Sequence, residues 1–110
     1  MKMILAILSR DDEMKTVDEL NKAQFFVTKL STTGGFLKKK NTTILIGTED
    51  ERVQEAIELI RANAQKRTEL RCTPAAIEPN GSMEMMPVPL EVEVGGCTIF
   101  VFPVEQMEKY

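Results

Sequence analysis

Residues 3–8 read MILAIL, an unbroken apolar run close to the N-terminus. A strand that is covered on both faces needs apolar side chains at successive positions, whereas a strand with one wet face alternates apolar and polar residues. The run is too short for the hydrophobic region of a signal peptide followed by a cleavage site, and charged residues 10–13 come directly after it. The pattern predicts a central, buried strand.

A helix is predicted to follow this strand. Two starts remain open, because Asp11 or Asp12 could cap the helix and residues 16–19 also have the pattern of a capping box. The apolar face of the helix would consist of Met14, Val17 and Leu20.

Two segments with strand character come next, residues 25–30 and residues 42–46. Both are rich in aromatic or β-branched side chains, and a glycine-containing segment lies between them. We expect the two segments to pair as a β-hairpin.

A second helix has the clearest signal in the sequence. Residues 48–51 have the form of a capping box, and their three acids suit the positive end of a helix dipole. Apolar residues then recur with helical spacing at Val53, Ala56, Ile57, Ile60 and Ala64. We predict that this stripe packs against a sheet.

The C-terminal part combines a predicted loop with further strands. Residues 68–90 have neither clear period and contain four prolines, which predicts a long loop. Residues 91–94 and 97–102 are typical of strands on either side of a turn or bulge at residues 95–96. The order βαββαβ, with an extra C-terminal strand possible, predicts one α+β domain over residues 1–110. Its ferredoxin-like antiparallel sheet would carry both helices on one face.

Such a sheet leaves its second face uncovered by helices. The residues considered for that face are Val27, Ile44, Ile46, Val92, Val94, Ile99 and Val101. A monomer would then expose a large apolar patch, so we expect a symmetric oligomer.

Composition excludes most familiar enzyme classes. The chain is 43% hydrophobic and 28% charged, as expected of a globular protein without a membrane span. It contains no histidine, which excludes a Ser-His-Asp triad, a Cys-His pair and a zinc site with imidazole ligands. The acidic pair Asp11-Asp12 is explained by helix capping better than by magnesium binding. We therefore predict no catalytic site, no metal and no cofactor, and hence a protein that is not an enzyme.

Charge and cysteine content narrow the choice of partners and compartment. The net charge of -3 argues against a protein that binds nucleic acid by neutralising its backbone. Cys72 and Cys97 lie too far apart for a metal motif and are too few for a disulfide scaffold. We expect reduced thiols in a cytoplasmic protein.

The segment between the hairpin strands, residues 31–41, has the composition of a nucleotide site. Gly34 and Gly35 can turn backbone amides toward an anion, residues 38–40 are three lysines, and Phe36 offers apolar surface to a flat ring. An ordinary solvated hairpin would also use glycines to turn and lysines to stay soluble. Composition leaves both interpretations open.

The methionines at positions 83, 85 and 86 allow two interpretations as well. Flexible thioethers adapt to more than one partner surface, so residues 68–90 could contact another protein. They could equally pack against their own domain or a neighbouring subunit.

Several segments together resemble a known family. They are TKL at 28–30, GGFL at 34–37, NTT at 41–43, GTEDERV at 47–53, VEVGG at 92–96 and FVFPVE at 100–105. The chain is similar over nearly its whole length to the PII-like cyclic di-AMP receptors, and GGFL followed by NTT is the most specific part. The resemblance implies a cytosolic homotrimer that binds the second messenger cyclic di-AMP in clefts between subunits.

The resemblance also assigns the ligand contacts residue by residue. They would be Thr28, Gly35, Phe36, Leu37 and Asn41, with Gly47 close by. Phe26 stands where relatives commonly have arginine, and Lys109 where some have glutamine, so Phe26 would replace guanidinium stacking by ring stacking.

These implications give a leading interpretation and two alternatives. The leading one is a non-enzymatic signal transduction protein that binds cyclic di-AMP and signals to an unidentified target by ordering residues 33–41 and 68–90. The alternatives are an ATP- or ADP-binding regulator of the PII type and a trimer that binds a protein target without any nucleotide.

Overall fold

The computed structural model describes residues 1–30, 40–73 and 88–110. In chain order the elements are β1 (Lys2–Ser9), α1 (Arg10–Lys22), β2 (Val27–Leu30), β3 (Asn41–Thr48), a 3-10 turn η1 (Asp50–Arg52), α2 (Val53–Ala64), β4 (Arg67–Thr73), β5 (Val88–Val94) and β6 (Cys97–Pro103). Residues 31–39 and 74–87, which include the glycine, lysine and methionine segments discussed above, lie outside the described residues.

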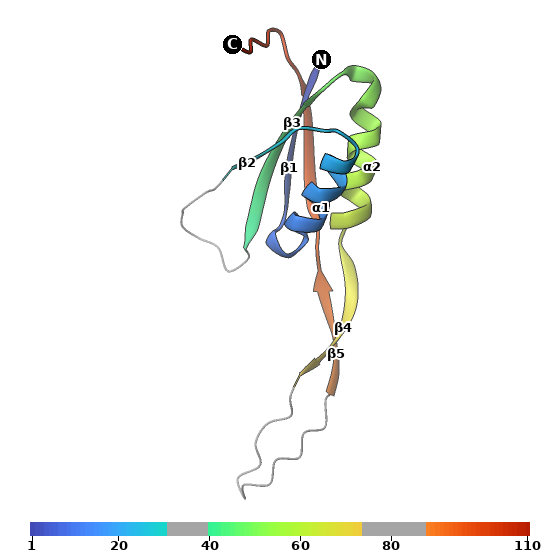
Figure 1. Ribbon diagram of the computed structural model, residues 1–110. Helices are drawn as coiled ribbons and strands as arrows, with labels where there is room; N and C mark the ends of the chain where they lie inside the picture. The colour runs from blue at the N-terminus through green and yellow to red at the C-terminus, as the bar shows by residue number, and fades with distance from the viewer. Residues whose placement is uncertain (31–39, 74–87) are drawn as a thin grey trace, which may run out of the picture.

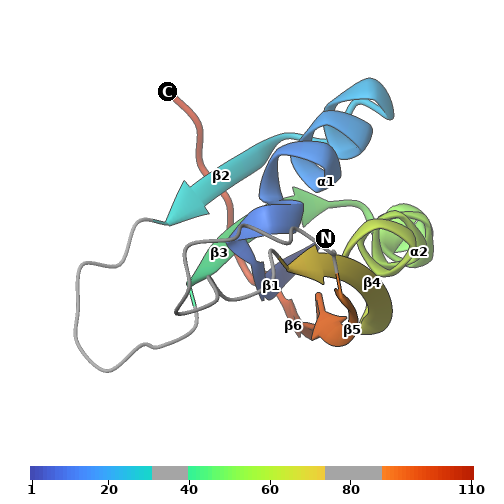
Figure 2. The same cartoon turned by 90° about the horizontal axis from the view of Figure 1, so that it is seen from below.

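The predicted ferredoxin-like fold is confirmed. Four strands form an antiparallel sheet in the order β2-β3-β1-β6. Both helices lie on one side of this sheet, as the two views in Figure 1 and Figure 2 show. The MILAIL strand β1 is central, because it pairs with β3 on one side and with β6 on the other. The predicted hairpin is also present, with Val27 opposite Ile46 and Leu30 opposite Thr43.

The core lies between the sheet and the helices. Ile4, Ala6 and Leu8 alternate along β1 and are buried beneath the helices, together with the even-numbered residues of β3. From α2 the stripe of Val53, Ala56, Ile60 and Ala64 is buried, and Ile57 packs against its edge. The predicted packing of the second helix on a sheet is therefore confirmed.

The buried face of the first helix is confirmed at Leu20, which is buried, and at Val17, which packs against the core, but it is wrong at Met14. Met14 was expected in its apolar face, but that side chain is 78% exposed. The buried positions are Asp12, Thr16 and Leu20, each one helical turn from the next. The prediction failed because an ion pair holds the buried Asp12, so that the buried face includes a polar residue.

Both predicted helix caps are wrong in detail. Ser9 is the N-cap of α1 and makes no side-chain capping bond, and Thr16 lies inside that helix. Thr48 is buried at the end of β3, and Glu49 precedes the 3-10 turn without a side-chain capping bond. Thr48 pairs with Lys2 as the last residue of β3, so it belongs to the strand and does not cap the helix.

Part of the predicted 68–90 loop is a β-ribbon. β4 and β5 pair from Arg67 opposite Val94 to Thr73 opposite Val88 and form a two-stranded sheet apart from the main one. In Figure 1 this ribbon projects away from the body below α2. Gly95 and Gly96, both with positive φ, connect it to β6. The strands predicted at residues 91–94 and 97–102 are confirmed and lie within β5 and β6, and the described residues 104–110 form no further strand.

The open face of the sheet carries a different set of residues from the predicted one. Register places Val27, Ile44, Ile46, Ile99 and Val101 on the helix-covered face, while Val92 and Val94 belong to the ribbon. The open face instead presents Leu5, Ile7, Leu45, Phe100 and Phe102. Alternation alone cannot tell which face of a sheet the helices cover.

Neither described helix has the length and apolar character needed to cross a bilayer.

Packing of α2 gives a direct stability prediction. Ile60 is fully buried, so Ile60→Ala should lower the free energy of unfolding by about 2–5 kcal/mol through lost burial and the cavity left behind. Met14→Ala should change it by less than about 0.5 kcal/mol, because Met14 is largely exposed. Urea unfolding of both variants at one protein concentration measures the difference. An equal loss of stability in the two variants would contradict the exposed position of Met14 on α1.

Candidate functional site

Three of the predicted ligand contacts share the open face of the sheet. Along β3 the even-numbered residues point toward the helices, so Asn41 and Gly47 point away from them. Thr28 of β2 lies opposite Leu45 and therefore projects from the same open face. Thr28 and Asn41 are exposed, and Gly47 is half-buried. Gly35, Phe36 and Leu37 lie outside the described residues.

A single chain does not gather these residues into one pocket. Asn41 and Gly47 begin and nearly end β3, six residues apart, which is about 20 Å at the usual rise of a strand. Thr28 lies nearer Gly47 along the sheet. The open face thus has a Thr28–Gly47 end and an Asn41 end.

Gly47 leaves space for an incoming group. Among the described residues, a Cβ atom added there would meet only the terminal methyl of Met1, at an ordinary contact distance of 3.6 Å. The packing of the described chain therefore does not require a glycine at this position, whereas a ligand or subunit approaching the backbone would.

Phe26 stands just before β2 with a highly exposed ring. The side chain is 85% exposed, and the Lys109 ammonium lies 5.8 Å from the ring centroid. This distance is within the range of a cation–π contact. The structure thus brings together Phe26 and Lys109, the two positions at which the sequence departs from the family that it resembles.

The neighbouring Phe25 has a structural role instead. It is buried, and the Arg52 guanidinium stacks 4.0 Å above its ring centroid. Arg52 Nη2 also donates a 2.7 Å hydrogen bond to the Ala23 carbonyl, which ties the start of α2 to the end of α1.

A hollow of about 500 Å³ is lined by Asn21, Gln24, Phe25 and Phe26. An aromatic floor with two amide side chains can accept a flat polar ring.

The Asn41 end of the sheet adjoins two further hollows that the sequence did not predict. One, of about 540 Å³, lies between Asn41, the end of α2 and the start of β6. The other, of about 370 Å³, lies between Lys40, Asn41, the start of α1 and the ribbon. Asn41 and Gly95 line both hollows. The diglycine was a visible signal, but its place near Asn41 follows from strand pairing, because Cys97 lies opposite Leu8 and Asn41 lies opposite Ser9 on β1.

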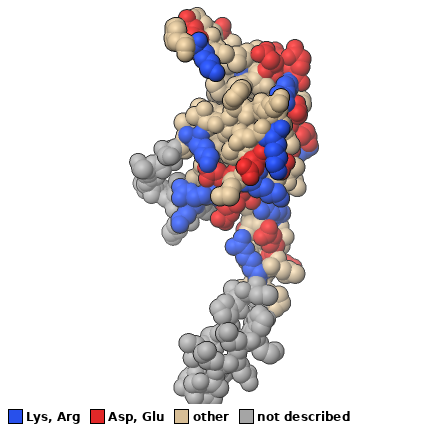
Figure 3. Space-filling model, viewed as in Figure 1, with Lys and Arg blue, Asp and Glu red and all other residues tan. Residues whose placement is uncertain are grey.

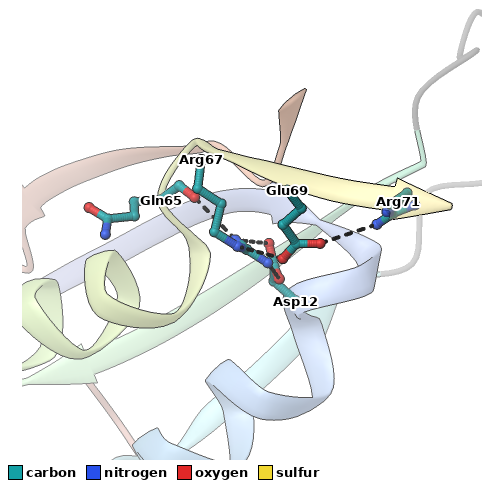
Figure 4. Close-up of polar contacts among 5 residues, drawn as sticks. All are labelled: Asp12, Gln65, Arg67, Glu69 and Arg71. Atoms are coloured by element: carbon teal, nitrogen blue, oxygen red, sulfur yellow. Dashed lines mark hydrogen bonds and ion pairs between the residues drawn. The ribbon is translucent and has the colours of Figure 1, made fainter. Parts of the chain in front are cut away.

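Charges of both signs meet where the ribbon joins the body, as Figure 3 shows. Arg67 of β4 donates from Nη2 to Asp12 Oδ1 at 2.8 Å and from Nη1 to Asp12 Oδ2 at 3.3 Å. Figure 4 shows Arg67 at the centre of this cluster, with Glu69 and the Gln65 carbonyl as its other acceptors. The hydrogen bonds that Arg67 donates to Asp12 are the main cause that raises the pKa of Arg67, which stays charged.

The described residues provide no visible nucleophile or metal centre. Burial, followed by the nearby Asp12 charge, raises the pKa of the Cys97 thiol, so that it is less readily ionised. Within residues 1–30, 40–73 and 88–110, no cluster of three or more Cys, Asp or Glu side chains is placed to hold a metal ion. The described geometry is suited to binding through hydroxyl, amide, backbone and aromatic groups.

Comparisons with known proteins agree with the architecture. A family model described as cyclic-di-AMP receptor matches residues 1–110. The crystal structure of a functionally unknown protein from Pediococcus pentosaceus ATCC 25745 is similar, with a TM-score of 0.77 and 38% sequence identity. The match covers 99% of this chain and 96% of that one.

The two connecting glycines predict unequal effects of substitution. Both have positive φ, so an alanine at either position strains the backbone. At Gly95 the new methyl would also overlap the Gln65 carbonyl oxygen, whereas at Gly96 it would meet open space within the described chain. Gly95→Ala should therefore lower the melting temperature more than Gly96→Ala does. The free energy of unfolding should fall by more than about 1 kcal/mol in the Gly95 variant. Thermal unfolding followed by circular dichroism tests the order, and a reversed order would contradict the described junction.

Proposed function

The chain belongs to the cyclic-di-AMP receptor family, and on that premise we propose that it binds cyclic di-AMP between the subunits of a homotrimer. The observation that carries the proposal is the shared position of Thr28, Asn41 and Gly47 on the open sheet face. The motifs name these residues, and the register of β2 on β3 adds that all three lie on one face.

Homotrimer formation would cover apolar surface on that same face. Phe100 is 52% exposed, and Phe102 and Leu30 are also exposed beside the partly buried Leu5 and Leu45. A contiguous apolar patch of this kind is typical of an association surface. Because one chain leaves Asn41 and Gly47 about 20 Å apart, a second subunit would supply the walls that the site lacks.

Each proposed contact has a specific chemical task. The Thr28 hydroxyl and the Asn41 amide can exchange hydrogen bonds with phosphate or adenine. Gly47 lets a ligand approach the backbone, and the exposed Phe26 ring can stack on a base. Gly35, Phe36 and Leu37 would supply backbone amides and apolar surface. Lys109, which already lies near Phe26, would add positive charge beside the ligand.

Signalling would follow from differences between the free and bound surfaces. Cyclic di-AMP can shift the protein only toward conformations to which it binds more tightly. We propose that signalling proceeds through loop ordering: binding at Asn41 stabilises one arrangement of residues 33–41 and 68–90, the β4–β5 ribbon included, and thereby changes what a downstream protein contacts.

Calorimetric titration with cyclic di-AMP is the primary test. Saturable binding of cyclic di-AMP, with which ATP and ADP compete only weakly, would support the proposal. Preferential binding of ATP or ADP would favour the mononucleotide regulator instead. No heat with any nucleotide, together with a trimer in solution, would favour the nucleotide-independent interaction protein.

Two conservative variants locate the ligand on the open face. Thr28→Val removes a hydroxyl with little change of shape, and Gly47→Ala adds one methyl for which the described residues leave space. Each should weaken cyclic di-AMP binding by about 1–3 kcal/mol, through an unpaired polar group or a steric clash, and leave the melting temperature nearly unchanged. Glu49→Ala, exposed just beyond β3, is the matched control. Unchanged titration curves for both variants would place the ligand elsewhere.

The association surface is tested by a charge on β6. Phe100→Asp places a carboxylate in the proposed interface, where burying an unpaired charge is costly, so the 12.4 kDa chain should sediment as a monomer. The same variant should lose cyclic di-AMP binding if neighbouring subunits complete the site. Met14→Asp, on the exposed side of α1, should remain trimeric. If the Phe100 variant is still a trimer, the open face of the sheet is not the subunit interface.

A further inference from the structure

The β4–β5 ribbon is attached to the body through a narrow base. Its two connections run side by side, since the Gly96 amide donates a 2.8 Å hydrogen bond to the Ala64 carbonyl. The Lys66 ammonium, just before β4, lies 3.3 Å from the Glu93 carboxylate of β5 and links the two sides of the ribbon near the same point. A two-stranded ribbon has little stability of its own, so its direction depends on contacts at this base.

One polar contact connects the ribbon to the first helix. Among the described side chains, Arg67 is the ribbon residue that hydrogen-bonds to α1, through both oxygens of Asp12 (Figure 4). The Asp12 side chain is only 8% exposed, and the Arg67 side chain is 37% exposed. Two parallel hydrogen bonds fix the orientation of a guanidinium on a carboxylate better than a single contact does. Asp12 therefore sets the angle at which β4 leaves α2.

The direction of the ribbon also determines the shape of the Asn41 hollows. Arg71 and residues 92–95 form one wall of the 370 Å³ hollow, opposite Lys40 and Asn41. Gly95 belongs to the walls of both hollows. A methyl group at Gly95 would lie 2.6 Å from Arg67 Nη1, so the guanidinium is packed closely against this glycine. Any rotation of the ribbon about its base would move a wall that faces Asn41.

We infer that the Asp12–Arg67 ion pair is a positioning contact of the ligand site, which holds the ribbon as a wall beside Asn41 and couples it to ligand occupancy. The inference rests on the proposed function, because it requires the ligand to bind at Asn41. Coupling is reciprocal: if the ribbon position favours the ligand, the bound ligand stabilises that ribbon position by the same factor. The ribbon is then the part of the molecule that reports occupancy.

The test compares two carboxylates that both pair with Arg67. Asp12→Asn keeps the shape but leaves one oxygen to accept from Arg67, and it breaks the charged link to α1. Glu69→Gln removes the other carboxylate, which lies within β4 and does not reach the body. Arg67→Lys provides a second variant, because it keeps the charge and loses the two-point contact. All are made in the full chain and titrated with cyclic di-AMP.

Asp12→Asn should weaken binding by about 2- to 30-fold, the usual range for substitutions that modulate coupling without touching ligand. Arg67→Lys should weaken it in the same range, and Glu69→Gln should leave it unchanged. Hydrogen exchange over residues 88–94 separates positioning from general destabilisation. Cyclic di-AMP should slow exchange there in the wild type and the Glu69 variant, and much less in the Asp12 variant, while residues 53–64 exchange alike in all three.

Three outcomes would overturn the inference. Wild-type affinity in the Asp12 variant would show that the ion pair does not shape the site, and equal losses in the Asp12 and Glu69 variants would show that the link to α1 has no special part. Ligand-induced protection of residues 88–94 that persists in the Asp12 variant would show that another contact couples the ribbon to the site. A wild-type protein that binds no cyclic di-AMP would instead overturn the proposed function itself.

Discussion

The fold depends on a strand that is apolar on both faces and hydrogen-bonded on both edges. β1 pairs with β3 and β6 along nearly its whole length, so neither edge can accept another strand. Ile4, Ala6 and Leu8 are covered by the helices, whereas Leu5 and Ile7 point to the other side. Two helices cover only one face of this sheet, and the second face keeps an apolar centre. Folding of one chain therefore leaves a surface that association would complete.

The same alternation connects association with ligand binding. A residue of β3 faces either the helices or the open side, and Asn41 and Gly47 face the open side together with Leu45. In the proposed homotrimer the ligand contacts and the subunit contacts are then neighbours on one face. Such a site would exist only when its walls are assembled, which would make oligomerisation a condition of binding. A separate pocket within one chain would impose no such condition.

Sequence patterns predicted the scaffold better than its faces. The stripe of α2, the β2–β3 pairing and the central β1 all follow from local periodicity, and the motifs named Thr28, Asn41 and Gly47 as site residues. Register and long-range pairing do not appear in local patterns. For that reason Ile44 and Ile46 were assigned to the wrong face. The sequence pattern likewise predicted a loop for β4 and for residues 88–90 of β5, although it predicted a strand at residues 91–94. Charged residues alternate along β4 at Arg67, Glu69 and Arg71, and this was the available but weak signal for a strand.

Asp12 shows why such signals are hard to use. Helical periodicity selects apolar residues for the buried face of α1, and it therefore selected Met14, which is exposed. The position is instead occupied by a carboxylate whose burial is made acceptable by the charged, two-point contact of Arg67, 55 residues away in sequence. Apolar stripes fix the parts that share one core, namely the sheet and the helices. A carboxylate buried within such a stripe needs a charged partner from outside that core, and the partner of Asp12 is Arg67 at the base of the projecting ribbon.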